Sequence, residues 1–246
     1  STVEKTALAD AEVEYNDHTS NTIYASFEIK KTSKDFLKKC HIIIWTTTPW
    51  TIPVNRALAY NSKIKYSVIQ IGKDTEHFKN RNIIVASELV DQVSKECNFK
   101  DFKVLKEFGG TDFKNAICSH PLINMGYDYD VPMLEGDFVN LEQGTGIVHS
   151  APSHGPDDFN LCLKHGIKAS NTMNDAGLYS NEVPYFSGTH IFKADRQVIE
   201  KLSEHKSLLG RGKLQHSFPH SWRSKAPLIY RATSQWFISM EKKDLR

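Results

Sequence analysis

The stretch IIIWTTTPWTIPVN, residues 42–55, joins an apolar run to a turn that is unusually rich in hydroxyl groups. Ile42, Ile43 and Ile44 follow His41 and predict a buried strand that ends near Trp45. Three threonines, two prolines and a second tryptophan follow at once. Each proline biases the residue before it toward extended backbone. The stretch is therefore either a plain chain reversal or a preorganised surface that holds a ligand.

Short extended segments are expected on both sides of this stretch. Residues 11–15 and 22–30 alternate apolar and polar side chains around a polar turn at residues 16–21. Further strands are expected at residues 65–71, 82–86, 102–108 and 131–134, and residues 227–239 are rich in strand-forming side chains. Many short strands with a few inserted helices predict an α+β, predominantly β domain that is β-barrel-like and not a doubly wound sheet.

Four segments have helical patterns: residues 33–39, 87–97, 156–165 and 193–209. Ser87 stands where a serine would cap the second helix. In the third helix, Pro156 occupies a first helical position and Gly166 follows the end, an asymmetry that is typical of helices.

Composition excludes several classes of protein. The 246 residues carry a formal charge of +2, which does not predict nucleic-acid binding by bulk electrostatics. The four cysteines form no C-x-x-C pair and favour a reducing compartment. We see no apolar run long enough to span a membrane and no signal peptide. The chain begins at Ser1 without methionine, which suggests a processed chain or an excised fragment.

Several catalytic signatures are missing from the sequence. There is no G-x-S-x-G, Walker A, G-x-G-x-x-G or H-E-x-x-H motif. His216 and His220 have H-x3-H spacing, but no upstream cysteine pair completes a zinc site. We interpret them as two ordinary histidines around a Ser-Phe-Pro turn and expect no metal.

A second informative stretch is GTGIVHSAPSHGPDDF, residues 144–159. Its two glycines flank Thr145, so that backbone can approach a ligand closely. Asp157 and Asp158 fall in the first turn of the expected helix, where acidic residues commonly meet free N–H groups. The alternative is a carboxylate at a cleft rim that pairs with a ligand ammonium group. His149 alone is more often a satisfied strand histidine than a functional one.

Taken together, the two stretches resemble the editing (CP1) domain of bacterial-type isoleucyl-tRNA synthetases, which are class I aminoacyl-tRNA synthetases. Residues 11–29, 216–225 and 231–238 match the same domain in the same order, so the resemblance covers nearly the whole chain. The related valyl and leucyl domains place arginine where this chain has Thr48. Another departure is Phe218, where the family often has tyrosine.

The resemblance implies a single editing domain over residues 1–246 with a core at about 40–210. Residues 1–31 and 211–246 would be β-rich segments leading to and from a missing synthetic domain. It implies post-transfer editing, the hydrolysis of mischarged valyl-tRNA(Ile), with valyl-adenylate left open as a second substrate. A second, size-excluding site is needed because one methylene gives a synthetic pocket only about 1–3 kcal/mol of discrimination, a value known for this enzyme class.

The resemblance also assigns roles. Asp158 would bind the α-ammonium group while Asp157 caps the helix. The implied catalytic residues are Asp158, Thr46, Thr47, Thr48 and His149. Threonine hydroxyls can both donate and accept at the terminal ribose and the ester carbonyl. Trp50, Thr51 and His149 would form the sieve wall, and Asn55 would brace the loop or touch the adenosine. The implied substrate-binding residues are Trp50, Thr51, Asn55, Gly144, Thr145, Gly146 and Phe218.

We expect no cofactor for editing, a cytoplasmic monomer, and two partners: the tRNA(Ile) 3′ acceptor end carrying valine and the remainder of the synthetase chain. Basic residues near Phe218 and Trp222 either meet the tRNA or form a solvated rim; they are Arg211, Lys213, Arg223 and Lys225. The alternatives are a non-catalytic tRNA acceptor-end binding module and a general small-ester hydrolase.

Overall fold

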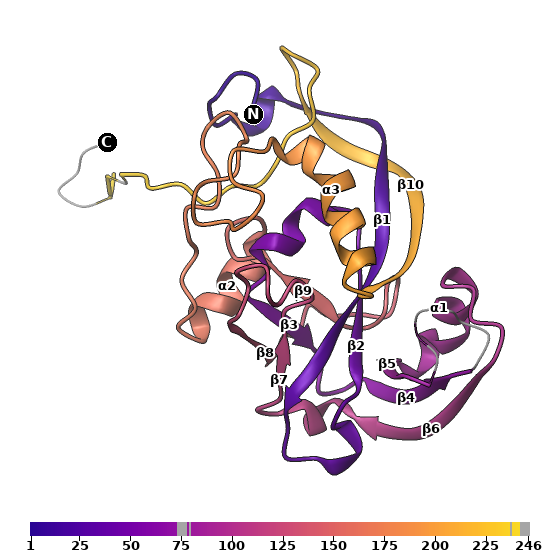
Figure 1. The fold of residues 1–246 in the computed structure, drawn as a ribbon. Helices are drawn as coiled ribbons and strands as arrows, with labels where there is room; N and C mark the ends of the chain where they lie inside the picture. The colour runs from indigo at the N-terminus through magenta and orange to yellow at the C-terminus, as the bar shows by residue number, and fades with distance from the viewer. Residues whose placement is uncertain (73–77, 79, 237, 242–246) are drawn as a thin grey trace.

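A computed structural model describes residues 1–72, 78, 80–236 and 238–241. Figure 1 shows the strands and helices of this part of the chain. The strands are β1 Val13–Lys31, β2 His41–Thr46, β3 Ala57–Tyr60, β4 Lys65–Ile71, β5 Asn82–Ala86, β6 Phe102–Gly109, β7 Ile117–Ser119, β8 Asp130–Glu135, β9 Val148–Ser150 and β10 Leu208–Ser221. The α-helices are α1 Val90–Glu96, α2 Pro156–Lys164 and α3 Ile191–Glu204. The 3₁₀ helices are η1 Asp10–Glu12, η2 Asp35–Leu37, η3 Pro49–Val54, η4 Ser87–Leu89 and η5 Gly110–Phe113.

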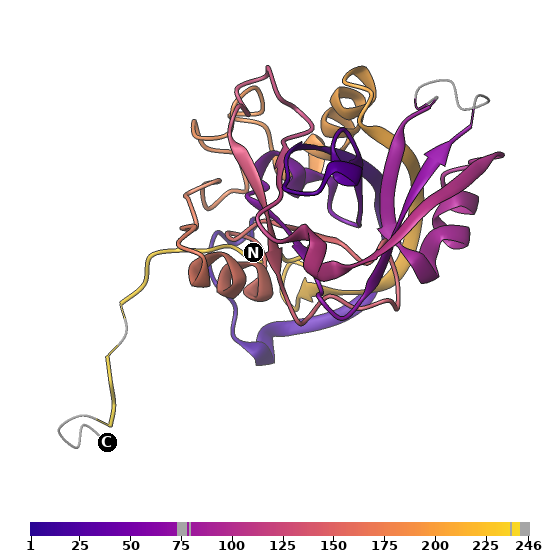
Figure 2. The same cartoon turned by 90° about the horizontal axis from the view of Figure 1, so that it is seen from below.

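The strands form one mixed sheet in the order β6-β4-β5-β2-β1-β7-β8-β3-β9, and β10 pairs with β1 beside this path. Most neighbours are antiparallel, but β2–β5 and β3–β8 are parallel. The sheet curves without closing, as the view from below shows (Figure 2). The predicted α+β, predominantly β fold is confirmed.

Strand β1 corrects the expectation of a turn at residues 16–21. It runs for 19 residues and pairs with β10 from Val13 to Ala25, with His18 opposite His216. From Ile23 to Glu28 it pairs with β2 and enters the core, with Ile23 opposite Thr46, and its last residues pair with β7. The polar residues belong to a two-stranded ribbon that is largely open to water, and such a ribbon needs no apolar face. His216 and His220 accordingly lie along β10, not around a turn.

Other boundaries follow the sequence with several corrections, and the helix expected at residues 33–39 is only the three-residue 3₁₀ turn η2. Strands β4 and β5 match their predicted limits, and α2 ends one residue early. Helix α3 ends at Glu204, because the chain enters β10 at Leu208. Ser87 does not cap α1, since its hydroxyl group contacts Ser67 Oγ at 2.8 Å. Residues 227–236 and 238–239 form no strand beyond a bridge between Pro227 and His220, and residue 237 lies outside the described residues.

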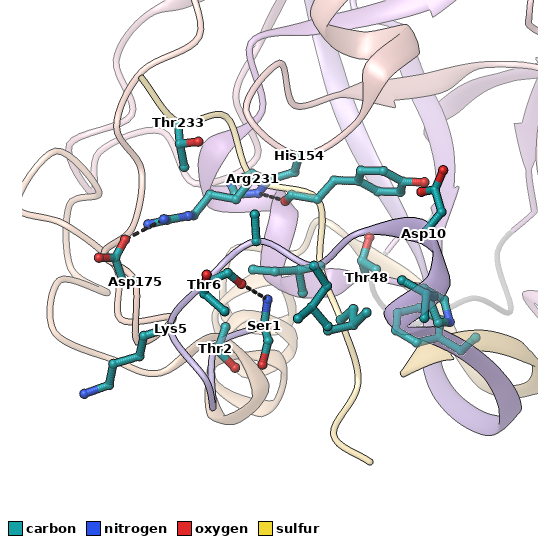
Figure 3. Close-up of a pocket in the computed structure, with 18 of the residues that line it drawn as sticks. Ser1, Thr2, Lys5, Thr6, Asp10, Thr48, His154, Asp175, Arg231 and Thr233 are labelled. Atoms are coloured by element: carbon teal, nitrogen blue, oxygen red, sulfur yellow. Dashed lines mark hydrogen bonds and ion pairs between the residues drawn. The ribbon is translucent and has the colours of Figure 1, made fainter. Parts of the chain in front are cut away.

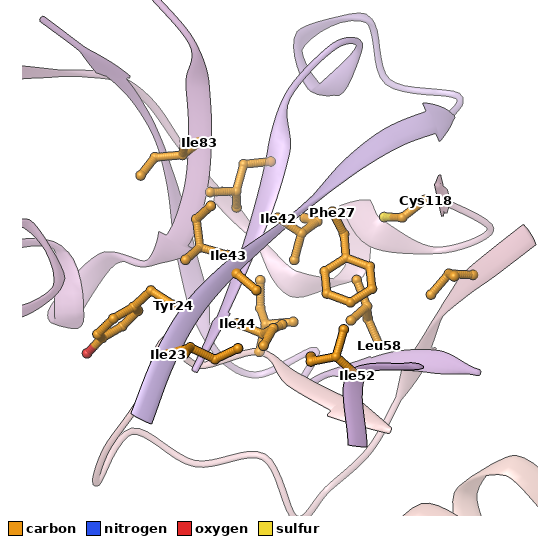
Figure 4. Close-up of a cluster of buried hydrophobic side chains, with 14 of the residues drawn as sticks. Ile23, Tyr24, Phe27, Ile42, Ile43, Ile44, Ile52, Leu58, Ile83 and Cys118 are labelled. Carbon is orange, nitrogen blue, oxygen red and sulfur yellow. The ribbon is translucent and has the colours of Figure 1, made fainter. Parts of the chain in front are cut away.

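The core lies where β1, β2 and η3 meet. Ile42, Ile43 and Ile44 are fully buried, and Ile52 of η3 packs into the same cluster as Phe27 (Figure 4). Burying a side chain of this size contributes about 1.5–3 kcal/mol. The apolar run before the threonines and the isoleucine after them therefore anchor both ends of the hydroxyl-rich turn.

Candidate functional site

The threonine-rich stretch folds into a tight turn that leads into η3. Thr46 Oγ1 accepts the backbone N–H of Thr48 at 3.1 Å and contacts Thr48 Oγ1 at 3.2 Å. The Thr48 carbonyl then accepts both the backbone N–H and the hydroxyl of Thr51, at 2.9 and 2.8 Å. Because each hydroxyl in this set has a fixed partner, the turn is rigid before any ligand arrives.

His149 of β9 supports this turn from behind. Its Nε2 lies 2.7 Å from Thr51 Oγ1, and its Nδ1 lies 3.1 Å from Asn55 Nδ2. Asn55 Nδ2 also donates to the Ala57 carbonyl at 2.9 Å. Thr51, His149 and Asn55 thus stand in the order of a nucleophile, a base and an orienting group.

The proton positions are wrong for a nucleophilic triad. An amide nitrogen can only donate, so His149 Nδ1 accepts from Asn55, and Nε2 of the neutral ring carries the proton. Burial lowers the pKa of His149 to about 4, which keeps the ring neutral at pH 7. His149 therefore donates to Thr51 and cannot withdraw its proton. The arrangement positions Thr51 and does not activate it.

A cavity of about 850 Å³ opens in front of the turn (Figure 3). Of the predicted residues, Thr48, Trp50, Thr51 and Phe218 line it. The N-terminal segment and the segment around Arg231 complete its wall. Within the described part of the chain, the lining does not include Thr46, Thr47, Asn55, Gly144, Thr145, Gly146, His149 or Asp158. Thr46 and Asn55 instead support the residues that do line it.

Asp158 lies at the start of α2, half-buried, and its Oδ2 accepts the backbone N–H of Ala151 at 3.2 Å. Ala151 directly follows β9, so this contact ties Asp158 to the strand that carries His149. Burial raises the pKa of Asp158 to about 6, and the Ala151 N–H partly offsets the rise. Asp157 is exposed and the N-cap residue Gly155 has no side-chain cap, so the expectation that Asp157 caps the helix is wrong.

The glycines at 144 and 146 serve packing of the loop. Both have a positive φ, +86° and +72°. A Cβ atom on Gly146 would lie 2.4 Å from Ala86 Cβ, and the Gly146 carbonyl accepts the hydroxyl of Tyr66. The Thr145 carbonyl accepts the Ala86 N–H at 2.8 Å. The sequence predicted close approach to a ligand, which stays a prediction; the close neighbour of Gly146 in the structure is Ala86 of the protein itself.

Several residues at the site were not predicted as site residues. His154 lies edge-on to Trp50 with ring centroids 5.0 Å apart, and its two ring nitrogens contact the Tyr230 carbonyl and Thr172 Oγ1. Burial lowers the pKa of His154 to about 4. Asp195 and Tyr179 hold the backbone of Trp50. His154 stood inside the second quoted stretch, whereas nothing in the local sequence marks the other two.

The basic residues do not form one cluster. Arg211 and Lys213 lie on β10 opposite Ile23 and Asn21, whereas Arg223 and Lys225 lie beyond the other end of the strand. At about 3.3 Å per residue the two pairs are roughly 30–40 Å apart. Two of these side chains also face carboxylates, in the pairs Arg223–Glu12 and Lys225–Glu14. Among the described residues, no helix combines the length and the apolar character needed to cross a membrane.

Comparisons with known proteins agree with this geometry. The family model for class I tRNA synthetases (I, L, M and V) matches residues 1–246. Isoleucine--tRNA ligase from Pelagibacter ubique is 63% identical over the whole chain, and that from Gluconobacter oxydans is 46% identical over 98% of it. The chain spans 27% of the length of each of these relatives.

A solved structure described as "The crystal structure of GlLeuRS-CP1" aligns with 78% of this chain and 98% of its own, with a TM-score of 0.61 and 15% identity, which shows a shared fold. The resemblance to the CP1 domain of isoleucyl-tRNA synthetases, carried by the two quoted stretches, is thereby confirmed in both sequence and fold. The chain belongs to the class I tRNA synthetases of the isoleucine, leucine, methionine and valine group.

Proposed function

We propose that this domain hydrolyses the ester that joins valine to the terminal adenosine of tRNA(Ile). The observation that carries the proposal is the rigid turn Thr48–Thr51, whose hydroxyl groups and tryptophan face a cavity of about 850 Å³. Such a cavity is within the size range of small-molecule sites, about 300–1,000 Å³. An aminoacylated adenosine is a ligand of this class.

The turn supplies both selection and polar contacts. Trp50 is 6% exposed and braced by His154, so it forms a stiff wall against a branched side chain. A stiff wall can reject the extra methylene of isoleucine, whereas an adaptable one would relax around it. Thr48 Oγ1 lies 3.3 Å from Thr51 Oγ1, and this pair offers donors and acceptors to the ribose and the ester carbonyl.

Hydrolysis proceeds by direct attack of an ordered water molecule in this proposal. The proton on His149 Nε2 leaves Thr51 without a base, which disfavours an acyl-enzyme route. The resemblance assigns to Asp158 the binding of the substrate's α-ammonium group, which would select aminoacyl esters over other esters, although Asp158 does not line the cavity itself. Its raised pKa is the expected sign of a carboxylate that lacks its cation, because burial without a partner disfavours ionisation.

The partners follow from the same proposal. The domain receives the valine-bearing 3′ end of tRNA(Ile) and works beside the rest of a cytoplasmic synthetase, without a cofactor for editing. The exposed side chains of Trp236, Ile238 and Tyr230 support a contact with the remainder of such a chain, since their exposed fractions are 100%, 76% and 66%.

The test is deacylation of valyl-tRNA(Ile) by the wild-type chain and by Asp158→Ala. Loss of valine with the wild type and at least a tenfold slower loss with the variant support the proposal. Equal tRNA binding by both proteins without deacylation would show a non-catalytic acceptor-end binding module. Isolation of a valyl-enzyme ester on Thr51 would contradict the water-attack route and favour a general esterase.

A further inference from the structure

The first turn of η3 has one backbone donor that its own residues cannot satisfy. Pro49 has no N–H, and the N–H of Thr51 is bound to the Thr48 carbonyl. The N–H of Trp50 points out of the turn and is accepted by Asp195 Oδ1 at 3.0 Å. A residue of α3, 145 positions along the chain, therefore caps the start of η3.

Asp195 holds this position at a cost. Its carboxyl group is half-buried, and its other oxygen is contacted by Asn21 Nδ2 of β1 at 3.4 Å. In the described part of the chain, no lysine, arginine or histidine forms an ion pair with it. Burial raises the pKa of Asp195 to about 6. A half-buried carboxylate without a cation is unfavourable for folding alone, so its contact with Trp50 calls for another explanation.

The other backbone polar group of Trp50, its carbonyl, is also held. The Trp50 carbonyl accepts the hydroxyl group of Tyr179, which is itself buried. Asp195 and Tyr179 thus fix the backbone of Trp50 from two separate segments. The side chain of Trp50 then has one position at the cavity, edge-on to His154. Without the Asp195 acceptor, the first turn of η3 would keep its core anchor at Ile52 but lose one of the two anchors that hold Trp50 at the cavity wall.

We propose that Asp195 is a positioning residue that sets the size selectivity of the cavity through the backbone of Trp50. The inference rests on the proposed function, in which Trp50 is the wall that rejects isoleucine. It assigns Asp195 no contact with substrate. Asp195 keeps Trp50 in one position. Discrimination between side chains that differ by one methylene depends on such a rigid cavity wall.

The variants Asp195→Ala and Asp195→Asn separate positioning from a general structural role. Asparagine keeps an oxygen acceptor for the Trp50 N–H and removes the charge, whereas alanine removes the acceptor. The ratio of valyl-tRNA(Ile) to isoleucyl-tRNA(Ile) deacylation rates should fall about tenfold in Asp195→Ala, within the range that one methylene can give. Asp195→Asn should keep the wild-type ratio. Glu200→Gln, a surface change on the same helix, is the matched control.

Three results would overturn the inference. One is an unchanged ratio in Asp195→Ala. Another is an equal loss of both rates that accompanies a lower Tm and is not restored by asparagine. The third is a loss of selectivity in Asp195→Asn. If Asp195→Ala does not fold, Tyr179→Phe removes the opposite anchor and should lower the same ratio; an unchanged ratio there also counts against the inference.

Amide hydrogen exchange at Trp50 tests the structural step without any substrate. The Trp50 N–H should be protected in the wild type and in Asp195→Asn, and should exchange at least tenfold faster in Asp195→Ala. Equal protection in all three proteins would contradict the capping contact. If the wild type shows protection but no deacylation, the proposed function fails while the role of Asp195 at Trp50 stands. If deacylation is selective for the valyl ester and this selectivity is unchanged in Asp195→Ala, the inference about Asp195 fails while the proposed function stands.

Discussion

Asp158→Asn is expected to stabilise the folded chain at about pH 7 while it abolishes the proposed hydrolysis. Burial raises the pKa of Asp158 from 3.8 to about 6 in the folded state. The folded state therefore binds this proton more tightly than the unfolded chain does. Its contribution to stability is fully present below about pH 4 and is lost as the pH rises through about 6. Asparagine stays neutral throughout and keeps an acceptor for the Ala151 N–H.

The size of the effect follows from the shift. Two pKa units correspond to about 2.7 kcal/mol, and the partial exposure of the side chain reduces the expected gain to about 1–2 kcal/mol. Urea unfolding at about pH 7 and about pH 4 measures it, with the exposed neighbour in Asp157→Asn as the control. The gain should appear only at the higher pH and only at Asp158. A loss of stability at about pH 7, or an equal change at both pH values, would refute the reasoning.

Three further predictions concern the same region. Thr51→Val should lower the free energy of unfolding by about 1–3 kcal/mol and slow deacylation, because His149 Nε2–H loses its acceptor. Thr51→Ser should retain the wild-type stability and the wild-type deacylation rate. Equal behaviour of the two variants would count against the contact. Gly146→Ala should lower the free energy of unfolding in urea more than Gly166→Ala does, because both glycines have a positive φ but only the Cβ at position 146 would meet Ala86. Equal losses of stability would show that the clash is relieved. Acidification from about pH 6.5 to 4 should lower stability, because burial depresses the pKa values of six histidines and the raised pKa values of only two carboxyl groups oppose them. The histidines are His18, His41, His120, His149, His154 and His190. A urea midpoint that stays constant over this range would contradict the expected sign.

Local patterns predicted the strands that are buried. Residues 65–71 and 82–86 carry apolar runs bounded by polar residues, and they became β4 and β5 with the same limits. The pattern failed on the first part of β1, because a ribbon with many water-exposed polar residues has a composition similar to that of a turn. It failed again at residues 227–236 and 238–239, where aromatic and β-branched side chains suggested a strand, but the described residues there form only a bridge between Pro227 and His220.

The candidate site could likewise be predicted from the sequence only in part. The turn Thr46–Thr51 and the loop around His149 were found because their chemistry is concentrated in short stretches. The cap by Asp195 and the anchor by Tyr179 join positions 145 and 129 residues apart, so no window of the sequence contains both partners. The tautomer of His149 likewise depends on Asn55, which lies 94 positions away.

The most direct test of the account is the ratio of initial deacylation rates for valyl-tRNA(Ile) and isoleucyl-tRNA(Ile) with the wild-type chain. The account predicts hydrolysis of the valyl ester at least tenfold faster than that of the isoleucyl ester, as expected for a cavity whose wall excludes one methylene. Equal rates on the two esters, or faster loss of isoleucine, would contradict it.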